Sequence, residues 1–356
     1  MLKIADEQAT YSHGWLTRWP DWIAYATMVW SLLYALLGLF WTLGSKGFPF
    51  GAGDPNPEYS IFRGLPVEVG APLIAALGCL CTVVALCLAS GWGRGIVRGA
   101  GRAFAWVCAL LLLLVIPDDR LLACVAHSFL LHFEMFNWTV INEFYCILGG
   151  ILWIGTAVVA GREAHQACLY CGRRSDIAIG WTRPEQALKW GRWAVAVAVF
   201  VPLIYCTTRW AFALGIPLGV SAEFLSSMER ENPGIWLGGA SIATLGLGGA
   251  LLTLGLIQRW GEVFPRWMIG LAGKRVPPLL AIIPATVVSI IVIEAGIGLI
   301  RHTINGTGVF SAQALAQDPS TVVPGLFWPL WGIALGLATL AYYYRRRGRC
   351  THCGQE

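Results

Sequence analysis

Long apolar segments alternate with short polar linkers along the whole chain. Several of these segments approach or exceed the roughly 20 residues that a helix needs to cross the hydrocarbon of a bilayer. We place eight spans at residues 22–44, 72–91, 102–117, 138–160, 192–213, 234–257, 278–300 and 325–344. The pattern predicts an all-α polytopic membrane protein with eight transmembrane helices.

One further apolar run does not fit this scheme as a span. Residues 121–131 are apolar, but a ninth span there would move the arginine-rich linker at 161–192 to the other side of the membrane. We therefore predict a re-entrant or interfacial helix near 120–136 on the outer side. The alternative is nine spans with the N-terminus outside.

The basic residues indicate the orientation of the spans. Lysine and arginine concentrate in cytoplasmic linkers of membrane proteins. Here they concentrate on one side, which includes Arg162, Arg173 and the run Arg345–Arg347. The exceptions are Lys46, Arg63, Arg120, Arg230 and Arg301 on the other side and Arg209 inside a span. This asymmetry predicts a multi-pass plasma-membrane protein with both termini in the cytoplasm.

Composition agrees with a membrane protein and limits the classes of partner. Of the 356 residues, 56% are hydrophobic and 13% are charged, against roughly 25% charged in soluble domains. The net charge of +5 is explained by the orientation of the spans and requires no nucleic acid. The expected partners are the lipid bilayer, a small solute, and either a cytoplasmic protein or a second copy of this chain.

The two halves of the chain resemble each other. An offset of 171 residues aligns Trp19 with Trp190 and Trp22 with Trp193, as well as Tyr34 with Tyr205 and Gly44 with Gly215. Four spans in each half make both halves enter the membrane in the same sense, as in parallel repeats. We predict a parallel four-plus-four repeat with units 1–177 and 178–356; the third spans align poorly, and the alternative is chance similarity among apolar helices.

Each half ends in the same cysteine motif. Cys168 and Cys171 precede Gly172, and Cys350 and Cys353 precede Gly354. Two pairs of thiolates can complete the tetrahedral ligand set of a zinc ion. The pairs are far apart in the sequence, but a duplication would bring them together beneath the membrane. We predict a structural Zn²⁺ site formed by Cys168, Cys171, Cys350 and Cys353.

Two alternatives remain for these cysteines. Pairs of this spacing also form redox dithiols, although such thiols usually sit at a helix N-terminus, whereas these follow helix C-termini. The two motifs could also bind metal separately or between the chains of a dimer. His352 lies between two better ligands, and we expect it to be a bystander.

A second group of polar residues falls within the outer part of the spans. Ionisable residues inside a membrane are functional candidates, and Arg209, Glu294, Asn142 and Glu143 all fall at similar depth. We expect an outward-opening polar site with an Arg209–Glu294 ion pair. The alternative is structural: an arginine that reaches interfacial water, or an ion pair that ties two helices together.

Several short motifs together carry a resemblance. They are Trp92-Gly93 and Trp260-Gly261 at the ends of the second spans, the turn at 215–219, and the paired Cys-x-x-Cys-Gly motifs. With these features the chain resembles uncharacterised bacterial multi-span membrane proteins with paired motifs of this kind. The resemblance implies membrane location and brings no known activity.

The sequence favours a transporter or permease-like protein over an enzyme. No phosphate-binding loop, zincin helix, nucleophile elbow or dinucleotide fingerprint is present. One alternative is an enzyme at the outer face, with candidates His127, His132, Asp118, Asp119 and Glu143. Another is a non-catalytic scaffold that binds a partner. A transporter predicts a continuous polar cavity, and an enzyme predicts histidines and carboxylates in an outer cleft.

Overall fold

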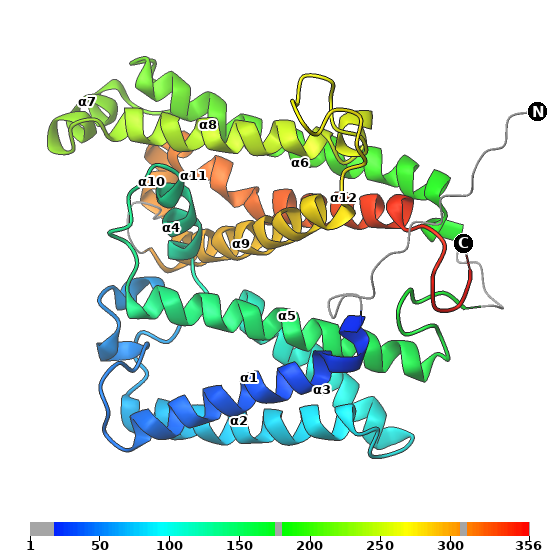
Figure 1. Cartoon of the computed structure of the whole chain (residues 1–356). Coiled ribbons are helices and arrows are strands. Elements are labelled where there is room, and N and C mark those ends of the chain that lie inside the picture. Colours follow the sequence, from blue (N-terminus) through cyan, green and yellow to red (C-terminus); the bar gives the residue numbers. More distant parts are fainter. Residues whose placement is uncertain (1–17, 175–179, 307–311, 356) are drawn as a thin grey trace, which may run out of the picture.

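The computed structural model describes residues 18–174, 180–306 and 312–355, which are helical apart from turns and linkers (Figure 1). Residues 1–17, which include Lys3 and carry the prediction of a cytoplasmic N-terminus, lie outside this description.

In the described part of the chain, eight helices are long and apolar enough to cross a membrane. They are α1 (Trp19–Thr42), α2 (Val67–Ala89), α3 (Ile96–Leu114), α5 (Trp138–Ala164), α6 (Pro184–Ala213), α8 (Ile235–Leu254), α9 (Pro278–Asn305), and α11 with α12 (Pro319–Leu326 and Trp328–Arg346). For the described residues, the prediction of an all-α protein with eight helices long and apolar enough to span a membrane is confirmed.

Shorter elements lie in the linkers between the long helices. They are α4 (Arg120–Phe129), α7 (Ala222–Glu231), α10 (Ala312–Gln317), and the 3-10 turns η2 (Gly51–Gly53), η3 (Pro57–Tyr59), η4 (Gly180–Thr182) and η5 (Arg259–Gly261). The ten residues of α4 extend about 15 Å, which is too short to cross a bilayer. The segment near 120–136 therefore forms a short helix and no ninth span, while its place on the outer side stays a prediction.

Local chemistry explains where several helices begin and break. The side chain of Asn137 accepts a hydrogen bond from the N–H of Val140 at 3.1 Å, which is the usual role of a helix N-cap. Helix α6 begins at Pro184 rather than at 192, because proline fits the first position of a helix. The eighth span breaks at Phe327, since Pro329 has no N–H to continue the hydrogen-bond ladder.

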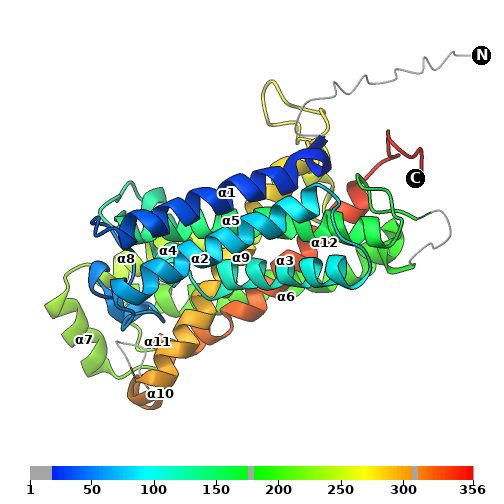
Figure 2. The same cartoon turned by 90° about the horizontal axis from the view of Figure 1, so that it is seen from below.

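The long helices run roughly side by side, so the molecule has two ends (Figure 1 and Figure 2). Helix α1 begins and helix α12 ends at the same end, which also holds the four motif cysteines; we call it the cysteine end. The opposite end, where η2, η3 and α4 lie, is called the acidic end. The arginine-rich linkers predicted to be cytoplasmic belong to the cysteine end, and the orientation in a membrane stays a prediction.

The long helices pack as two groups. In the first body, α1 packs on α2 and α5, and α3 packs on α5; in the second body, α6 packs on α8 and α12, and α9 packs on α12. Figure 1 shows these groups as the blue-to-green and green-to-red parts of the chain. Each body has its own apolar core, one built from residues between 30 and 157 and the other from residues between 194 and 342.

A smaller apolar cluster joins the two bodies. It contains Leu113, Leu121 and Ile147 of the first body and Ile291 of the second. Contacts of α3 and α4 with α9 extend the same interface. The interface between the bodies is therefore thinner than the core inside either of them.

The first helix of each body ends in the same backbone structure. At the end of α1, the N–H of Gly44 donates to the carbonyl of Trp41 and that of Ser45 to Phe40; α6 repeats this pattern 171 residues later. Gly44 and Gly215 both adopt a left-handed conformation, with φ of 87° and 75°, which favours glycine. The division into units 1–177 and 178–356 stays a prediction, and this matching cap agrees with it.

Close packing of α1 on α2 generates a stability prediction. A Cβ atom on Gly78 would lie 2.8 Å from the backbone of Ala35, whereas a Cβ on Gly248 of α8 would meet nothing within 4 Å. We predict that Gly78→Ala lowers the free energy of unfolding by about 1–3 kcal/mol, and that Gly248→Ala does not. Thermal unfolding in detergent measures both, and equal melting temperatures would contradict the packing described here.

Candidate metal centre and buried charge cluster

The two cysteine motifs fold in the same way. In the first, the N–H of Cys168 donates to the carbonyl of Arg173 and the N–H of Gly172 donates to the carbonyl of Cys168. In the second, Cys350 pairs with Gln355 and Gly354 with Cys350 in the same pattern. Gly172 and Gly354 have φ of 72° and 73°, a left-handed conformation that lets the backbone turn around the thiols.

The four thiols form one cluster, called here the thiol cluster. All four Sγ atoms lie within 4.8 Å of one another. The distance is 4.0 Å between the sulfurs of Cys168 and Cys350 and 3.6 Å between those of Cys171 and Cys353. Four sulfurs bound tetrahedrally to zinc at about 2.3 Å lie about 3.8 Å apart. The cluster could therefore hold a metal ion such as zinc, with ligands from both halves of one chain.

Neighbouring groups hold the two motifs against each other. The guanidinium of Arg173 donates to the carbonyl oxygens of Gly348 at 3.1 Å and Gln355 at 2.7 Å. The ring of His352 packs edge-on against Tyr170, with ring centroids 4.0 Å apart, and the histidine is not part of the thiol cluster. The hydroxyl of Tyr170 donates to the carboxylate of Asp21, which ties the cluster to the start of α1.

The surroundings affect individual thiols differently. Burial raises the pKa of Cys171 to about 12, with the neighbouring thiols adding to the effect. Burial also opposes ionisation of Cys350, but the backbone N–H groups of Cys353 and His352 outweigh it and lower the pKa of that thiol to about 7. A metal ion would bind all four as thiolates and would release their protons.

A second cluster of functional side chains lies at the acidic end. It consists of Asp54, Asp118, Arg120, Glu143 and Glu294, all of them buried, and is called here the charge cluster. The guanidinium of Arg120 donates to both carboxylate oxygens of Asp54, at 2.7 and 2.8 Å, and to those of Asp118, at 2.6 and 2.8 Å. Glu143 lies farther away, with 3.5 Å between its Oε1 and the guanidinium.

The charge on Arg120 follows from these contacts. Burial opposes the charge of Arg120, but hydrogen bonds to Asp118 and Asp54 outweigh it and raise its pKa. Arg120 is therefore cationic and balances part of the negative charge around it.

Polar contacts beside the charge cluster join the two bodies. Nε2 of His302, on α9, lies 3.2 Å from Oδ1 of Asp119. Arg301 donates to the carbonyl oxygen of Tyr59 at 2.7 Å, and the Tyr59 and His302 rings meet edge-on with centroids 5.4 Å apart. The acidic end is thus an interface between α9 and the linkers of the first body.

The predicted outer site is only partly assembled. Glu143 and Glu294 lie close enough to interact electrostatically, and Asn142 is buried, where it accepts a hydrogen bond from Tyr34 at 3.2 Å. Arg209 does not form the expected ion pair with Glu294. Its guanidinium donates to the carbonyl of Thr321 at 3.1 Å and lies over the ring of Tyr205.

Packing explains this error in the prediction. Helix α6, which carries Arg209, and helix α9, which carries Glu294, both pack on α11 and α12 but do not pack closely on each other. Sequence reasoning missed Asp54 and Arg120 as partners. A signal was present, because Arg120 is one of the few basic residues on the arginine-poor side.

The histidines proposed for an outer-face enzyme do not join the charge cluster. The ring of His127 bonds to the carbonyl of Ala123 on its own helix, and His132 is exposed. Asp118 and Glu143 do meet, but they are buried rather than placed in a cleft.

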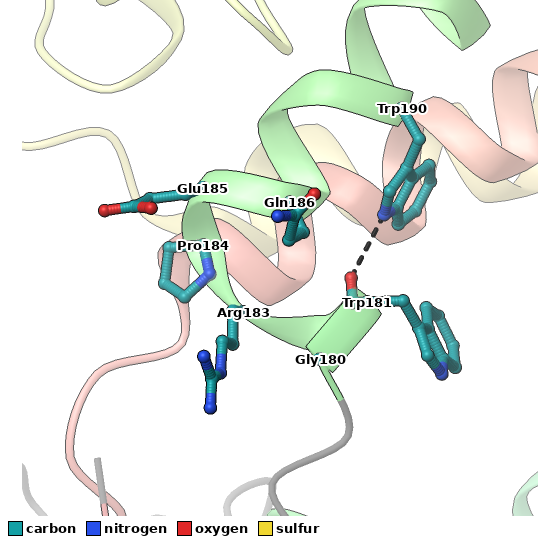
Figure 3. Close-up of a pocket in the computed structure, with 7 residues that line it drawn as sticks. All are labelled: Gly180, Trp181, Arg183, Pro184, Glu185, Gln186 and Trp190. Carbon is teal, nitrogen blue, oxygen red and sulfur yellow. Dashed lines mark hydrogen bonds between the residues drawn. The ribbon is translucent and has the colours of Figure 1, made fainter.

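Among the described residues, two cavities at the cysteine end stand out. The larger, of about 630 Å³, is an open groove lined by η4 and the start of α6, where the indole N–H of Trp190 donates to the carbonyl of Trp181 at 3.1 Å (Figure 3). The smaller, of about 260 Å³, lies between the start of α3 and the end of α5. Neither forms the continuous polar cavity that an open transporter would show.

Comparison with protein-family models, with curated proteins and with solved structures finds no match for this chain. The resemblance to bacterial multi-span proteins with paired cysteine motifs therefore identifies no family. The findings describe a multi-span membrane protein with a four-cysteine cluster, and function has to be argued from the two clusters themselves.

The thiol cluster predicts the metal content of the protein. We predict that the purified protein carries about one zinc ion per chain and that a variant with serine at all four cysteine positions carries none. Elemental analysis of the detergent-purified protein measures this. Cys79 and Cys87 lie outside the thiol cluster, so the Cys79→Ser/Cys87→Ser variant is the matched control and keeps its zinc. Equal zinc in the serine variant and the wild type would exclude the site.

The contacts of the charge cluster predict how the loss of the Arg120 guanidinium changes folding stability. Replacing Arg120 by methionine leaves buried carboxylates without their partner, a change that costs about 3–5 kcal/mol of folding stability in buried pairs. The control is Arg63→Met, because Arg63 is exposed in a linker at the same end. Chemical unfolding in detergent should therefore show a large decrease in the free energy of unfolding for Arg120→Met and little change for Arg63→Met. A small decrease of similar size in both variants would count against the charge cluster.

Proposed function

We propose that this protein transports a small solute by movement of its two four-helix bodies against each other, with a structural zinc ion at the cysteine end. The observation that carries the proposal is the meeting of buried ionisable residues from both bodies at a thin interface. Charged residues are costly inside a membrane and commonly mark pathways for ions or substrates.

The separation into two bodies supports relative motion. Each body has its own apolar core, and a small cluster around Leu121 and Ile291 joins them. Transporters built from repeats commonly work by rocking of one repeat against the other around a site at their interface. The similar order of helix contacts in the two bodies supports the same interpretation.

Hydrogen bonds to water can replace the contacts between the two bodies at the acidic end. The Arg301–Tyr59 hydrogen bond and the His302–Asp119 contact involve groups that water can also satisfy. Opening this end would hydrate the charge cluster, which is shut off from solvent in the structure described here. The cost of separating these polar groups is therefore small compared with that of opening either core.

The thiol cluster would hold the two bodies together at the cysteine end while they move against each other. Four sulfur ligands fill the tetrahedral shell of zinc and leave no open position for a substrate or an activated water. The ion would therefore act structurally, by joining the ends of α5 and α12. With the cysteine motifs joined in this way, the two bodies pivot about the zinc ion, so the acidic end is the one that opens. The arginine distribution favours the outer side for this end.

A membrane scaffold is the second candidate function. It is favoured by the cavities, since the two described above lie at the cysteine end and neither reaches the charge cluster. A scaffold would keep the acidic end closed permanently, so the two candidates differ in whether that end opens.

Cys124 provides a native probe of opening. It lies on α4, is completely buried, and is close enough to Glu143 to interact electrostatically. Cys146 is equally buried but belongs to the core of the first body. We predict that maleimide alkylates Cys124 at least about tenfold faster than Cys146, because partial opening costs less free energy than global unfolding.

Peptide mass spectrometry on the wild-type protein in liposomes locates the modified cysteines. The comparison needs no mutation, since both thiols are present in the same chain. Equal protection of Cys124 and Cys146 would remove the transport proposal and favour the scaffold.

A further inference from the structure

The charge cluster and its neighbours contain more acidic than basic groups. Electrostatic interactions connect Glu294 with Asp118, Asp119, Arg120 and Arg301, and they connect Glu143 with Asp118, Arg120 and Glu294. With Asp54, this makes five carboxyl groups. The bases are the two guanidiniums and the ring of His302. If every acid were ionised, the site would hold a net negative charge largely shielded from water, since only Asp119 among the five is partly exposed.

The close hydrogen bonds of Arg120 and Arg301 go to groups other than Glu143 and Glu294. Arg120 makes close hydrogen bonds to Asp54 and Asp118, and only a 3.5 Å contact to Glu143. Arg301 donates to the carbonyl of Tyr59. The uncompensated negative charge is therefore concentrated on Glu143 and Glu294.

Both glutamates also carry an oxygen for which the described residues supply no partner. The Oε2 atoms of Glu143 and Glu294 are buried and accept no hydrogen bond from these residues. The two glutamates are only 2% and 1% exposed. A buried carboxylate oxygen without a donor is strongly unfavourable. A proton on this oxygen removes the charge and converts the acceptor into a donor.

The arrangement of ligand atoms favours a proton over a metal ion. A divalent or monovalent metal cation needs several oxygen ligands around one point. Among the residues that the structure describes, the thiol cluster is the only set of three or more histidine, cysteine or carboxylate ligand atoms close enough to share an ion. The carboxylates at the acidic end do not form such a set.

Other titratable groups lie beside Glu143 or beside the acidic neighbours of the two glutamates. Cys124 on α4 and Cys146 on α5 interact with Glu143, and Tyr59 interacts with Asp119 and Arg120. These groups are neutral thiols and a phenol under ordinary conditions. They leave the excess negative charge of the carboxylates unchanged.

We propose that Glu143 and Glu294 form a proton-binding site at the interface of the two bodies, and that release of this proton is coupled to opening of the acidic end. The coupling rests on the transport function proposed above, whereas proton binding itself does not. When the acidic end opens, an O–H bond on a glutamate breaks and the proton passes to a water molecule, which becomes hydronium. When it closes, the carboxylate takes a proton from hydronium, leaves water, and is buried in neutral form.

Infrared spectroscopy of the full-length protein tests proton binding directly. The C=O stretch of a protonated carboxyl group is separate from the absorption of a carboxylate, and it shifts in D₂O. We expect the wild type, reconstituted in liposomes at neutral pH, to show this band. We expect Glu294→Gln and Glu143→Gln each to reduce the band and the double variant to lose it. Glu223→Gln, at an exposed position on α7, is the control and keeps the full band.

The outcomes separate proton binding from transport. Absence of the band in the wild type, or an unchanged band in the double variant, overturns the proton site. The wild-type measurement does not depend on how the variants fold. The infrared assay detects a bound proton rather than motion. The band can therefore be absent while rapid alkylation of Cys124 still supports an opening interface. Equally, the band can be present while Cys124 stays protected.

Discussion

Four sulfur atoms within 4.8 Å of one another require that two segments separated by 182 residues meet at one point. Each segment follows a long helix within a few residues, and the ends of α5 and α12 lie at the same end of the molecule (Figure 1). The contact of Tyr170 with Asp21 brings the start of α1 to the same place. This constraint sets the two bodies side by side and in the same sense, so their opposite ends also become neighbours.

At that opposite end, the cost of burying charge determines the contacts. Arg120 gathers Asp54 and Asp118 from the linkers of its own body, and α9 adds Glu294, Arg301 and His302. One apolar cluster, which is smaller than the core of either body, joins the bodies between the two ends. The proposed division of roles follows from this contrast: a fixed metal-bound end, and a polar end whose contacts water can replace.

Parts of the fold and of the site that depend on local pattern were predictable from the sequence. Apolar length identified the eight spans, and the repeated motif identified the cysteines that cluster. The partners of Arg120 were not predictable, because Asp54 and Asp118 lie in linkers whose path no periodicity encodes. The expected Arg209–Glu294 pair was wrong because equal depth in a membrane does not specify which helices are neighbours. Arg209 instead meets Thr321, since α6 packs beside α11.

X-ray absorption at the zinc edge of the full-length protein most directly tests whether one metal ion joins the two halves. The account predicts four sulfur neighbours at about 2.3 Å in a protein that is monomeric by light scattering. A shell containing nitrogen or oxygen ligands, or zinc bound only in a dimer, would contradict it.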